Sequence, residues 1–178
     1  MSVKKTIIIL CDWFLPGYLA GGPIQSIATL TQQLSNDIDF KIITTDRDFK
    51  SNKPYDKVKV NEWTQYEGRT VFYISPENMN ADYVLKLIQS TNHDAIYLNS
   101  LFSKLFAVSP LKWKQQGKLN SKIILAPRGM LGDGALAIKA FKKQLFLIYA
   151  KVFGLFKDIV WQSTSAQETS EIKKRIGS

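Results

Sequence analysis

An arginine and a glycine directly follow an apolar run in the second half of the chain. Residues 123–126 read Ile-Ile-Leu-Ala, as expected of a strand buried on both faces of a parallel sheet. Pro127 has no N–H to donate and so ends the strand, leaving Arg128 at its carboxyl end, where open α/β sheets bind ligands. The planar fork of Arg128 suits an anionic or polyhydroxyl ligand, and Gly129 allows a close backbone approach. The alternative is an arginine that only ties two loops together.

Further candidate ligand groups also follow predicted strands. Gly21 and Gly22 precede a helix that begins at Pro23, where a missing N–H costs nothing. The N–H groups at this helix start form a candidate phosphate-binding site. Asn99 and Ser100 fall at the carboxyl end of a later strand, where ligand groups are expected.

The acidic and nucleophilic side chains suggest less chemistry. Asp12 and Asp133, both on carboxyl-end loops, are candidates for acid–base or acceptor contacts, with loop shaping as the alternative. His93 precedes a strand, at the wrong end of the sheet for chemistry, and Cys11 ends an apolar run and is interpreted as a small buried residue. A single cysteine and a single histidine exclude an intrachain disulfide, a cysteine-based zinc cluster and a multi-histidine metal site.

Two further patterns have structural explanations. Ser165-x-x-Glu168 is a capping box, in which both side chains satisfy N–H groups at a helix start, and it needs no ligand site. The opening strand, glycine loop and helix are compatible with a dinucleotide-binding domain. However, G-x-G-x-x-G is absent and the loop is far longer than that tight turn.

Strand and helix patterns alternate along all 178 residues, which form one predicted domain, 1–178. Buried strands are predicted at 6–11, 40–45, 70–75, 95–99, 123–126 and 159–162, with an extended edge segment at 58–63 and a turn at 67–68. Helices are predicted from 23, at 80–90, 102–116 and 135–155, and from 165 to 177. The expected fold is an α/β, Rossmann-like parallel sheet of about six strands with helices on both faces.

The charge of the chain is unevenly distributed. Residues 1–100 carry 10 Lys and Arg against 11 Asp and Glu, whereas residues 101–178 carry 14 against 4. A basic second half suggests an anionic partner, such as a membrane surface, nucleic acid or a phosphorylated substrate. A merely solubilising surface is the alternative.

The helix predicted at 135–155 is rich in both large apolar residues and lysines. Its density of apolar side chains exceeds a single stripe, which favours core packing for most of them. It could also pack against a second domain, or meet anionic lipid as a basic amphipathic surface. The membrane-surface candidates are Lys139, Lys142, Lys143 and Lys151.

Several blocks, in this order, together resemble the amino-terminal half of family 4 glycosyltransferases. They are Ala20-Gly21-Gly22-Pro23, Val71-Phe72-Tyr73-Ile74-Ser75-Pro76, Asn99-Ser100-Leu101-Phe102-Ser103, Ala126-Pro127-Arg128-Gly129-Met130-Leu131, Lys142-Lys143 and Thr164-Ser165-x-x-Glu168. The resemblance covers nearly the whole chain, and the Pro-Arg-Gly-Met-Leu block is its most specific part.

The resemblance implies the GT-B architecture, in which two Rossmann-like domains face each other across a cleft. This chain would be the acceptor-side domain, and the carboxyl-terminal donor-binding domain would be its missing partner. Gly21 and Gly22 match glycines that approach the donor phosphates or sugar, and Arg128 and Gly129 match a loop facing the cleft. The implied enzyme transfers a sugar from a nucleotide-sugar co-substrate to a hydroxyl of a bacterial surface glycan, free or lipid-linked, without a metal ion or other cofactor. It would act in the cytoplasm, at the inner face of the membrane for a lipid-linked acceptor.

Two departures from the family pattern shape the expectations. Many relatives have a histidine at or near the position of Asn99, and the donor-side glutamates spaced eight apart are absent from residues 1–178. This stretch alone is therefore expected to be inactive, either as a truncated half-enzyme or as one subunit of a split enzyme. The alternative is a non-enzymatic polyanion- or membrane-binding α/β module. Nucleic acid is not expected, because the aromatic residues of the basic half sit at core spacing.

Overall fold

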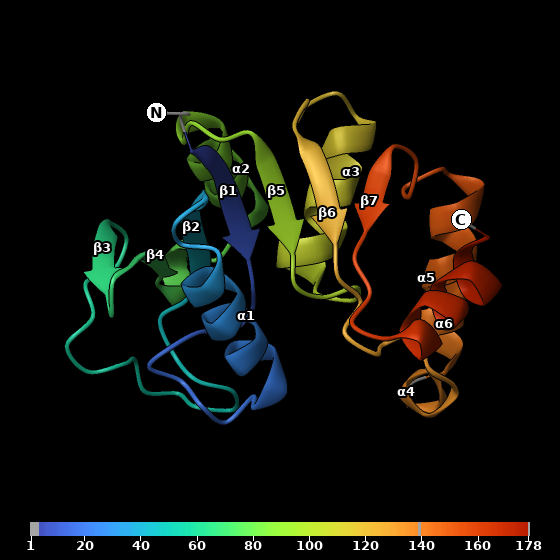
Figure 1. Ribbon diagram of the computed structural model, residues 1–178, viewed down its shortest axis with the longest axis horizontal. Helices are drawn as coiled ribbons and strands as arrows, with labels where there is room; N and C mark the ends of the chain where they lie inside the picture. The colour runs from blue at the N-terminus through green and yellow to red at the C-terminus, as the bar shows by residue number, and fades with distance from the viewer. Residues whose placement is uncertain (1–3, 139, 178) are drawn as a thin grey trace. The chain divides into compact units, whose positions relative to one another are not determined.

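The computed structural model describes residues 4–138 and 140–177 and has an α/β fold (Figure 1). Its strands form one mostly parallel seven-stranded sheet in the order β3-β4-β2-β1-β5-β6-β7. The strands are β1 (Lys5–Leu10), β2 (Ile38–Thr45), β3 (Trp63–Tyr66), β4 (Arg69–Ile74), β5 (Ala95–Leu98), β6 (Lys122–Leu125) and β7 (Ile159–Trp161). The α-helices are α1 (Gly22–Gln33), α2 (Ala81–Ser90), α3 (Ser109–Gln115), α4 (Asp133–Ala137), α5 (Ala140–Val152) and α6 (Ala166–Ile176). The predicted Rossmann-like α/β class is confirmed, with one strand more than expected.

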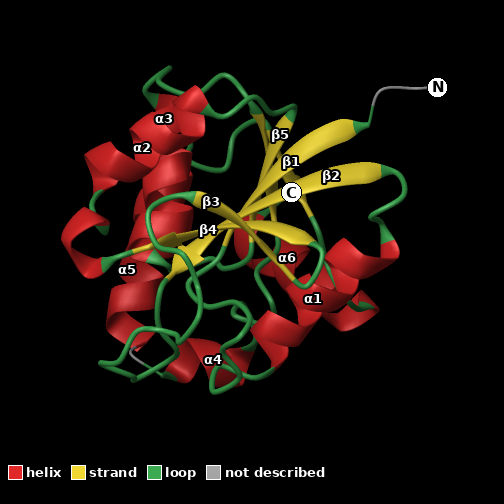
Figure 2. Ribbon diagram, turned by 90° about the vertical axis from the view of Figure 1, so that its left-hand side faces the viewer, coloured by secondary structure: helices red, strands yellow, loops and turns green. Residues whose placement is uncertain are grey.

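The chain divides into two compact units, Met1–Tyr97 and Leu98–Ser178. In the first unit, β1, β2 and β4 run parallel, and α1 and α2 cover opposite faces of these strands (Figure 2). Ile24 and Ile27 of α1 and Val84 and Ile88 of α2 are fully buried, at the helical spacing that the sequence predicts. The two amphipathic helices therefore close both faces of this part of the sheet.

Local capping signals of the first unit are confirmed. Pro23 lies in the first turn of α1. The Asn80 side chain accepts a hydrogen bond from the Tyr83 N–H at 3.0 Å, which caps α2 as predicted. Cys11 is buried, and burial raises the pKa of its thiol to about 12, so the thiol stays protonated and is not a nucleophile.

The strand β3 corrects the prediction of an extended segment at 58–63. That segment forms an isolated bridge at Val60 and contributes only Trp63 to the strand, which lies further along, antiparallel to β4. Glu67 and Gly68 make the connecting turn with φ values of 47° and 74°, so the predicted turn is confirmed. A two-residue hairpin turn with both φ values positive matches the twist of the strands and sets the register in which Trp63–Tyr66 pair with β4.

In the second unit, β6 and β7 pair in parallel, and α3 lies behind β6 in Figure 1. The helix predicted at 102–116 consists of a π-helical turn, Lys104–Val108, followed directly by α3. Pro110 stands in the first turn of α3, where its missing N–H breaks no helical bond. Gly117, with φ of 70°, follows the helix and ends it as predicted.

The helix predicted at 135–155 is two helices, α4 and α5, because Ile138 takes an extended conformation with ψ of 115°. The expectation that most of its apolar side chains are core is wrong for α5. Leu147 and Ala150 are buried, but Phe141, Leu145, Ile148, Val152 and several neighbours are exposed. Within residues 4–138 and 140–177, no helix has the length and apolar character needed to cross a membrane.

Candidate functional site

The loop after β6 carries the arginine and glycine that the sequence singles out. Ala126 continues the strand pairing by donating its N–H to the Leu98 carbonyl at 3.0 Å. Arg128 and Gly129 then both take left-handed conformations, with φ of 54° and 73°. A positive φ is unusual for a residue with a side chain and costs free energy that the surrounding structure must offset. Two hydrogen-bonded contacts to the loop offset this cost.

The first anchor joins this loop to the loop after β5. Arg128 donates from Nε to the Oδ1 atom of Asn99 at 2.7 Å, and Asn99 is buried. This contact holds the guanidinium over the carboxyl ends of the two strands. It also shows that Arg128 ties two loops together, which is the structural role considered for it; a ligand role stays a prediction.

The second anchor comes from Glu168 in the first turn of α6, which is 3% exposed. Its carboxylate accepts from the Gly129 N–H at 2.7 Å, and from the N–H and hydroxyl of Thr164 at 2.6 and 2.7 Å. Burial alone raises the pKa of this carboxyl, but these hydrogen bonds and the positive charge of Arg128 outweigh it and hold the pKa below its usual value. Glu168 is therefore an anionic support beneath the Arg128 loop.

Glu168 is the functional candidate that sequence reasoning missed. The capping box is confirmed for Ser165, whose hydroxyl accepts from the Glu168 N–H at 3.1 Å. The carboxylate, however, binds the N–H of Thr164, one residue before the cap, and that of Gly129, 39 residues away in sequence. The Ser-x-x-Glu pattern identifies the residue but contains no information about its long-range partner.

Ser100 and Asp133 have structural roles in the second unit. The Ser100 hydroxyl accepts from the Ser103 N–H at 3.2 Å and lies 3.7 Å from the Met130 sulfur, so it shapes its own loop. Asp133 stands in the first turn of α4 with a highly exposed side chain and pairs with Arg175 of α6.

In the first unit, Gly21 caps α1 with φ of 64°, and both Gly21 and Gly22 are exposed. The predicted phosphate-binding site has few N–H groups that could bind a phosphate. Gly21 donates its N–H to Tyr18, Ile24 and Gln25 donate to the Gly21 carbonyl, and Pro23 has none. Added Cβ atoms at Gly21 and Gly22 would meet nothing within 4 Å, so no close approach within the chain requires these glycines.

The loop from Asp12 to Gly22 is held by Asp48, which sequence reasoning did not single out. The buried Asp48 carboxylate accepts from the N–H groups of Tyr18 and Leu19 at 2.8 and 3.1 Å, and from that of Phe49. Burial raises the pKa of Asp48, but these three hydrogen bonds outweigh burial and hold the pKa below its usual value. Asp12 itself accepts a hydrogen bond at its backbone carbonyl from the Thr45 hydroxyl at 2.9 Å.

The predicted residues thus form two sets. Asn99, Arg128 and Gly129 meet around Glu168 in the second unit, whereas Asp12, Gly21 and Gly22 belong to the first. Their gathering on one concave surface stays a prediction.

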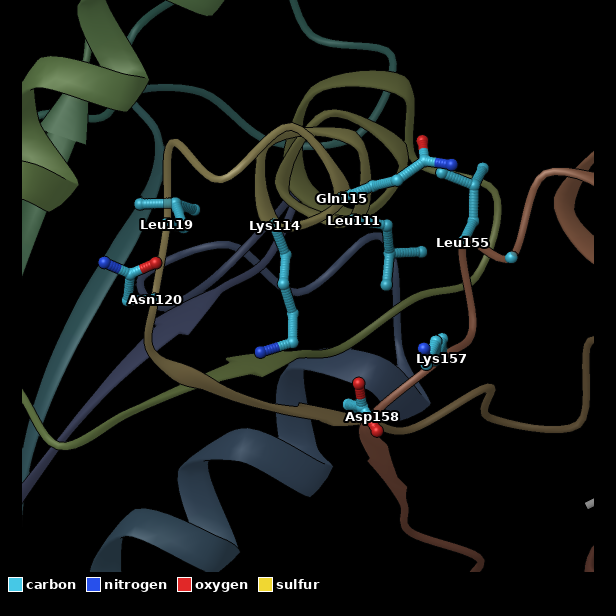
Figure 3. A pocket seen from close by; sticks show the side chains of 9 residues that line it. Leu111, Lys114, Gln115, Leu119, Asn120, Leu155, Lys157 and Asp158 are labelled. Atoms are coloured by element: carbon cyan, nitrogen blue, oxygen red, sulfur yellow. The ribbon is translucent and has the colours of Figure 1, made fainter.

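A separate recess lies at the other end of β6 and β7, about 310 Å³ in volume. Figure 3 shows its lining side chains, with Lys114 of α3 and Asp158 just before β7. Lys114 donates to the Ser121 carbonyl, just before β6, at 3.1 Å. This recess therefore lies at the amino ends of the strands, opposite the end where parallel sheets bind ligands, and belongs to neither set.

The fold and the loops at the strand ends define an α/β, Rossmann-like protein with polar groups at the carboxyl ends of parallel strands. No model of a known protein family matches the chain, and no curated protein matches it. Within residues 4–138 and 140–177, no three His, Cys, Asp or Glu side chains gather as a metal site would require.

Replacing Gly129 by alanine is expected to lower the free energy of unfolding by about 1 kcal/mol, because only the left-handed conformation opposes a side chain there. An added Cβ meets nothing within 4 Å, so no clash contributes. Gly134→Ala in α4 is the matched control, since Gly134 has equally open space and no positive φ. Chemical denaturation of both variants tests this. A loss of 3 kcal/mol or more at Gly129, or an equal loss at both positions, would contradict the conformational explanation.

Proposed function

We propose that residues 1–178 form the acceptor-side domain of a nucleotide-sugar-dependent glycosyltransferase resembling family 4. One observation carries the proposal. Three blocks of the resemblance, at residues 99–103, 126–131 and 164–168, converge through the Asn99–Arg128 and Gly129–Glu168 hydrogen bonds. Blocks that are distant in sequence but joined at the carboxyl end of β6 fit a ligand-binding edge better than scattered structural motifs.

In this proposal the Arg128 loop orients an acceptor. An arginine fork donates hydrogen bonds to hydroxyl or phosphate oxygens, and Asn99 and Glu168 hold the Arg128 loop in one conformation. Such preorganisation reduces the ordering cost of binding. Transfer would also need a nucleotide-sugar bound by a second, donor-side domain, with the acceptor hydroxyl held close to the sugar carbon. No metal ion is part of this proposal.

The second candidate, a non-enzymatic polyanion- or membrane-binding module, is favoured by one observation. The basic half exposes both lysines and aromatic side chains, including Phe141 and Phe153. Because these two aromatic side chains are exposed, core packing does not exclude their contact with nucleic acid.

Backbone amide NMR of residues 1–178 tests the two candidates. If the glycosyltransferase proposal is right, neutral oligosaccharides shift amides at 99–103 and 127–132. Arg128→Ala should then weaken binding about 10- to 100-fold, the usual contribution of a charged hydrogen bond. Arg175→Ala, which removes a cation of α6 in the same unit, should leave binding unchanged.

The opposite result would favour the module. Heparin or single-stranded DNA would then bind with a steep salt dependence, and neutral oligosaccharides would shift nothing. Thermal melting of each variant separates a lost ligand contact from a disrupted loop, because Arg128→Ala also removes the contact to Asn99.

A further inference from the structure

The helix α5 has two apolar faces. One is packed within the second unit and includes Leu147 and Ala150, which are 7% and 0% exposed. The other faces solvent and consists of Phe141, Leu145, Ile148 and Val152, which are 79%, 56%, 60% and 73% exposed and which we name the α5 ridge. The spacing of four, three and four residues places these side chains in one stripe along the helix.

Two further exposed apolar side chains adjoin the helix in the sequence. Ile138 precedes it and Phe153 follows it, at 67% and 56% exposed. Soluble proteins leave single apolar side chains exposed, but a contiguous apolar stripe of this length marks an interaction surface. The 13 residues of α5 span about 20 Å at 1.5 Å per residue.

The charge around the ridge identifies the kind of partner. No acidic residue lies between Asp133 and Asp158, and this interval contains five lysines. At 100° per residue, Lys142 and Lys151 lie on opposite flanks of the ridge, and both are exposed. An apolar stripe with a cation on each flank and no acidic residue in the helix complements an anionic lipid surface, in which lysine stems lie along the apolar region while their ammonium groups reach the phosphates.

Of the other lysines named from the sequence, Lys143 is not on a flank of the ridge. Lys143 is turned toward its own unit: it donates to the Ala135 carbonyl and lies 5.1 Å from the centre of the Phe102 ring. Lys139 lies outside the described residues. Lys142 and Lys143 also line a recess with Lys104, Phe102, Val108 and Phe146.

We propose that α5 docks in the plane of an anionic membrane, with the ridge at the boundary of the acyl chains and Lys142 and Lys151 at the headgroups. Apolar insertion and charge attraction then act together, so that salt weakens binding without abolishing it. Membrane docking of this kind does not depend on the chain being a transferase.

Vesicle sedimentation tests the proposal with residues 1–178. We expect binding to phosphatidylcholine vesicles that contain about 30% phosphatidylglycerol, and much weaker binding to pure phosphatidylcholine. The double variant Phe141→Ser/Leu145→Ser should lower the partition coefficient at least tenfold, because it removes two large apolar side chains from the acyl-chain boundary. Tyr18→Ser/Leu19→Ser is the matched control, since these residues are also exposed but lie in the first unit.

A second pair of variants tests the charges. Lys142→Gln/Lys151→Gln should reduce binding to anionic vesicles several-fold, whereas Lys173→Gln/Lys174→Gln on α6 should change it less. Equal binding by the ridge variant and the unmodified chain would overturn the proposal. Absence of vesicle binding by the unmodified chain would also overturn it. Dimerisation or DNA binding that the ridge variant abolishes would then identify the ridge as the surface for that other partner. All substituted side chains are exposed, so melting temperatures should stay close to that of the unmodified chain.

Discussion

Glu168→Ala is expected to lower the free energy of unfolding by about 3 kcal/mol, because it removes three hydrogen bonds to a buried, ionised carboxylate. The carboxylate accepts three hydrogen bonds, from the Gly129 N–H and from two donors of Thr164, and it is almost fully buried. Urea denaturation at pH 7 measures the loss. Amides of the Arg128 loop should also lose hydrogen-exchange protection in the variant, because this carboxylate accepts the hydrogen bond from the Gly129 N–H.

Glu171→Ala is the matched control on the same helix, since its carboxylate accepts a hydrogen bond from the exposed Gln167 side chain. It is expected to change stability by less than about 0.5 kcal/mol. Equal losses for the two variants would mean that α6 needs acidic residues only for its general charge and that the Gly129 contact contributes nothing.

The contribution of Glu168 should also depend on pH. Its pKa in the folded protein is lowered, so the stabilisation is complete above the unfolded value of about 4.3 and is lost as pH falls through the folded value. The stability difference between the unmodified chain and Glu168→Gln should therefore be constant from pH 6 to 8 and shrink below about pH 4. A difference that grows on acidification would contradict the assigned direction.

Residues 1–178 alone are expected to bind nucleotide sugars no more tightly than roughly millimolar, which corresponds to about −4 kcal/mol. The resemblance assigns the nucleotide to a second domain, and the start of α1 offers few N–H donors because Gly21, Ile24 and Gln25 already donate to carbonyls. Without donor and acceptor held together, sugar transfer should be undetectable.

Isothermal titration with UDP- and GDP-sugars measures this, and a cooperative thermal transition shows that the sample is folded. Free UDP is the matched ligand control: if only the nucleotide matters, it should bind as weakly as the sugar conjugates. Micromolar affinity for any donor, or turnover by residues 1–178, would contradict the half-enzyme proposal and point to a self-sufficient site.

Local signals in the sequence were sufficient for the buried parallel strands and for most helix boundaries. Asn80, Pro23 and Gly117 were identified correctly because capping and termination depend on a few neighbouring backbone groups. Unbroken apolar runs likewise predicted the buried parallel strands. The shift of β3 toward Tyr66 could not be read from residues 58–63, since its position is set by the turn that pairs it with β4.

The sequence by itself determined the α/β class and the position of Arg128 and Gly129 after a buried strand, because both follow from periodicity and from residues adjacent in the chain. Only the tertiary structure decided which groups support that loop. Glu168 reaches Gly129 across 39 residues, and no local pattern specifies such a pairing. The exposure of the α5 ridge was likewise decided by packing: a helix that is apolar on two sides can bury only the side that meets its own unit, and here Leu147 and Ala150 occupy that side.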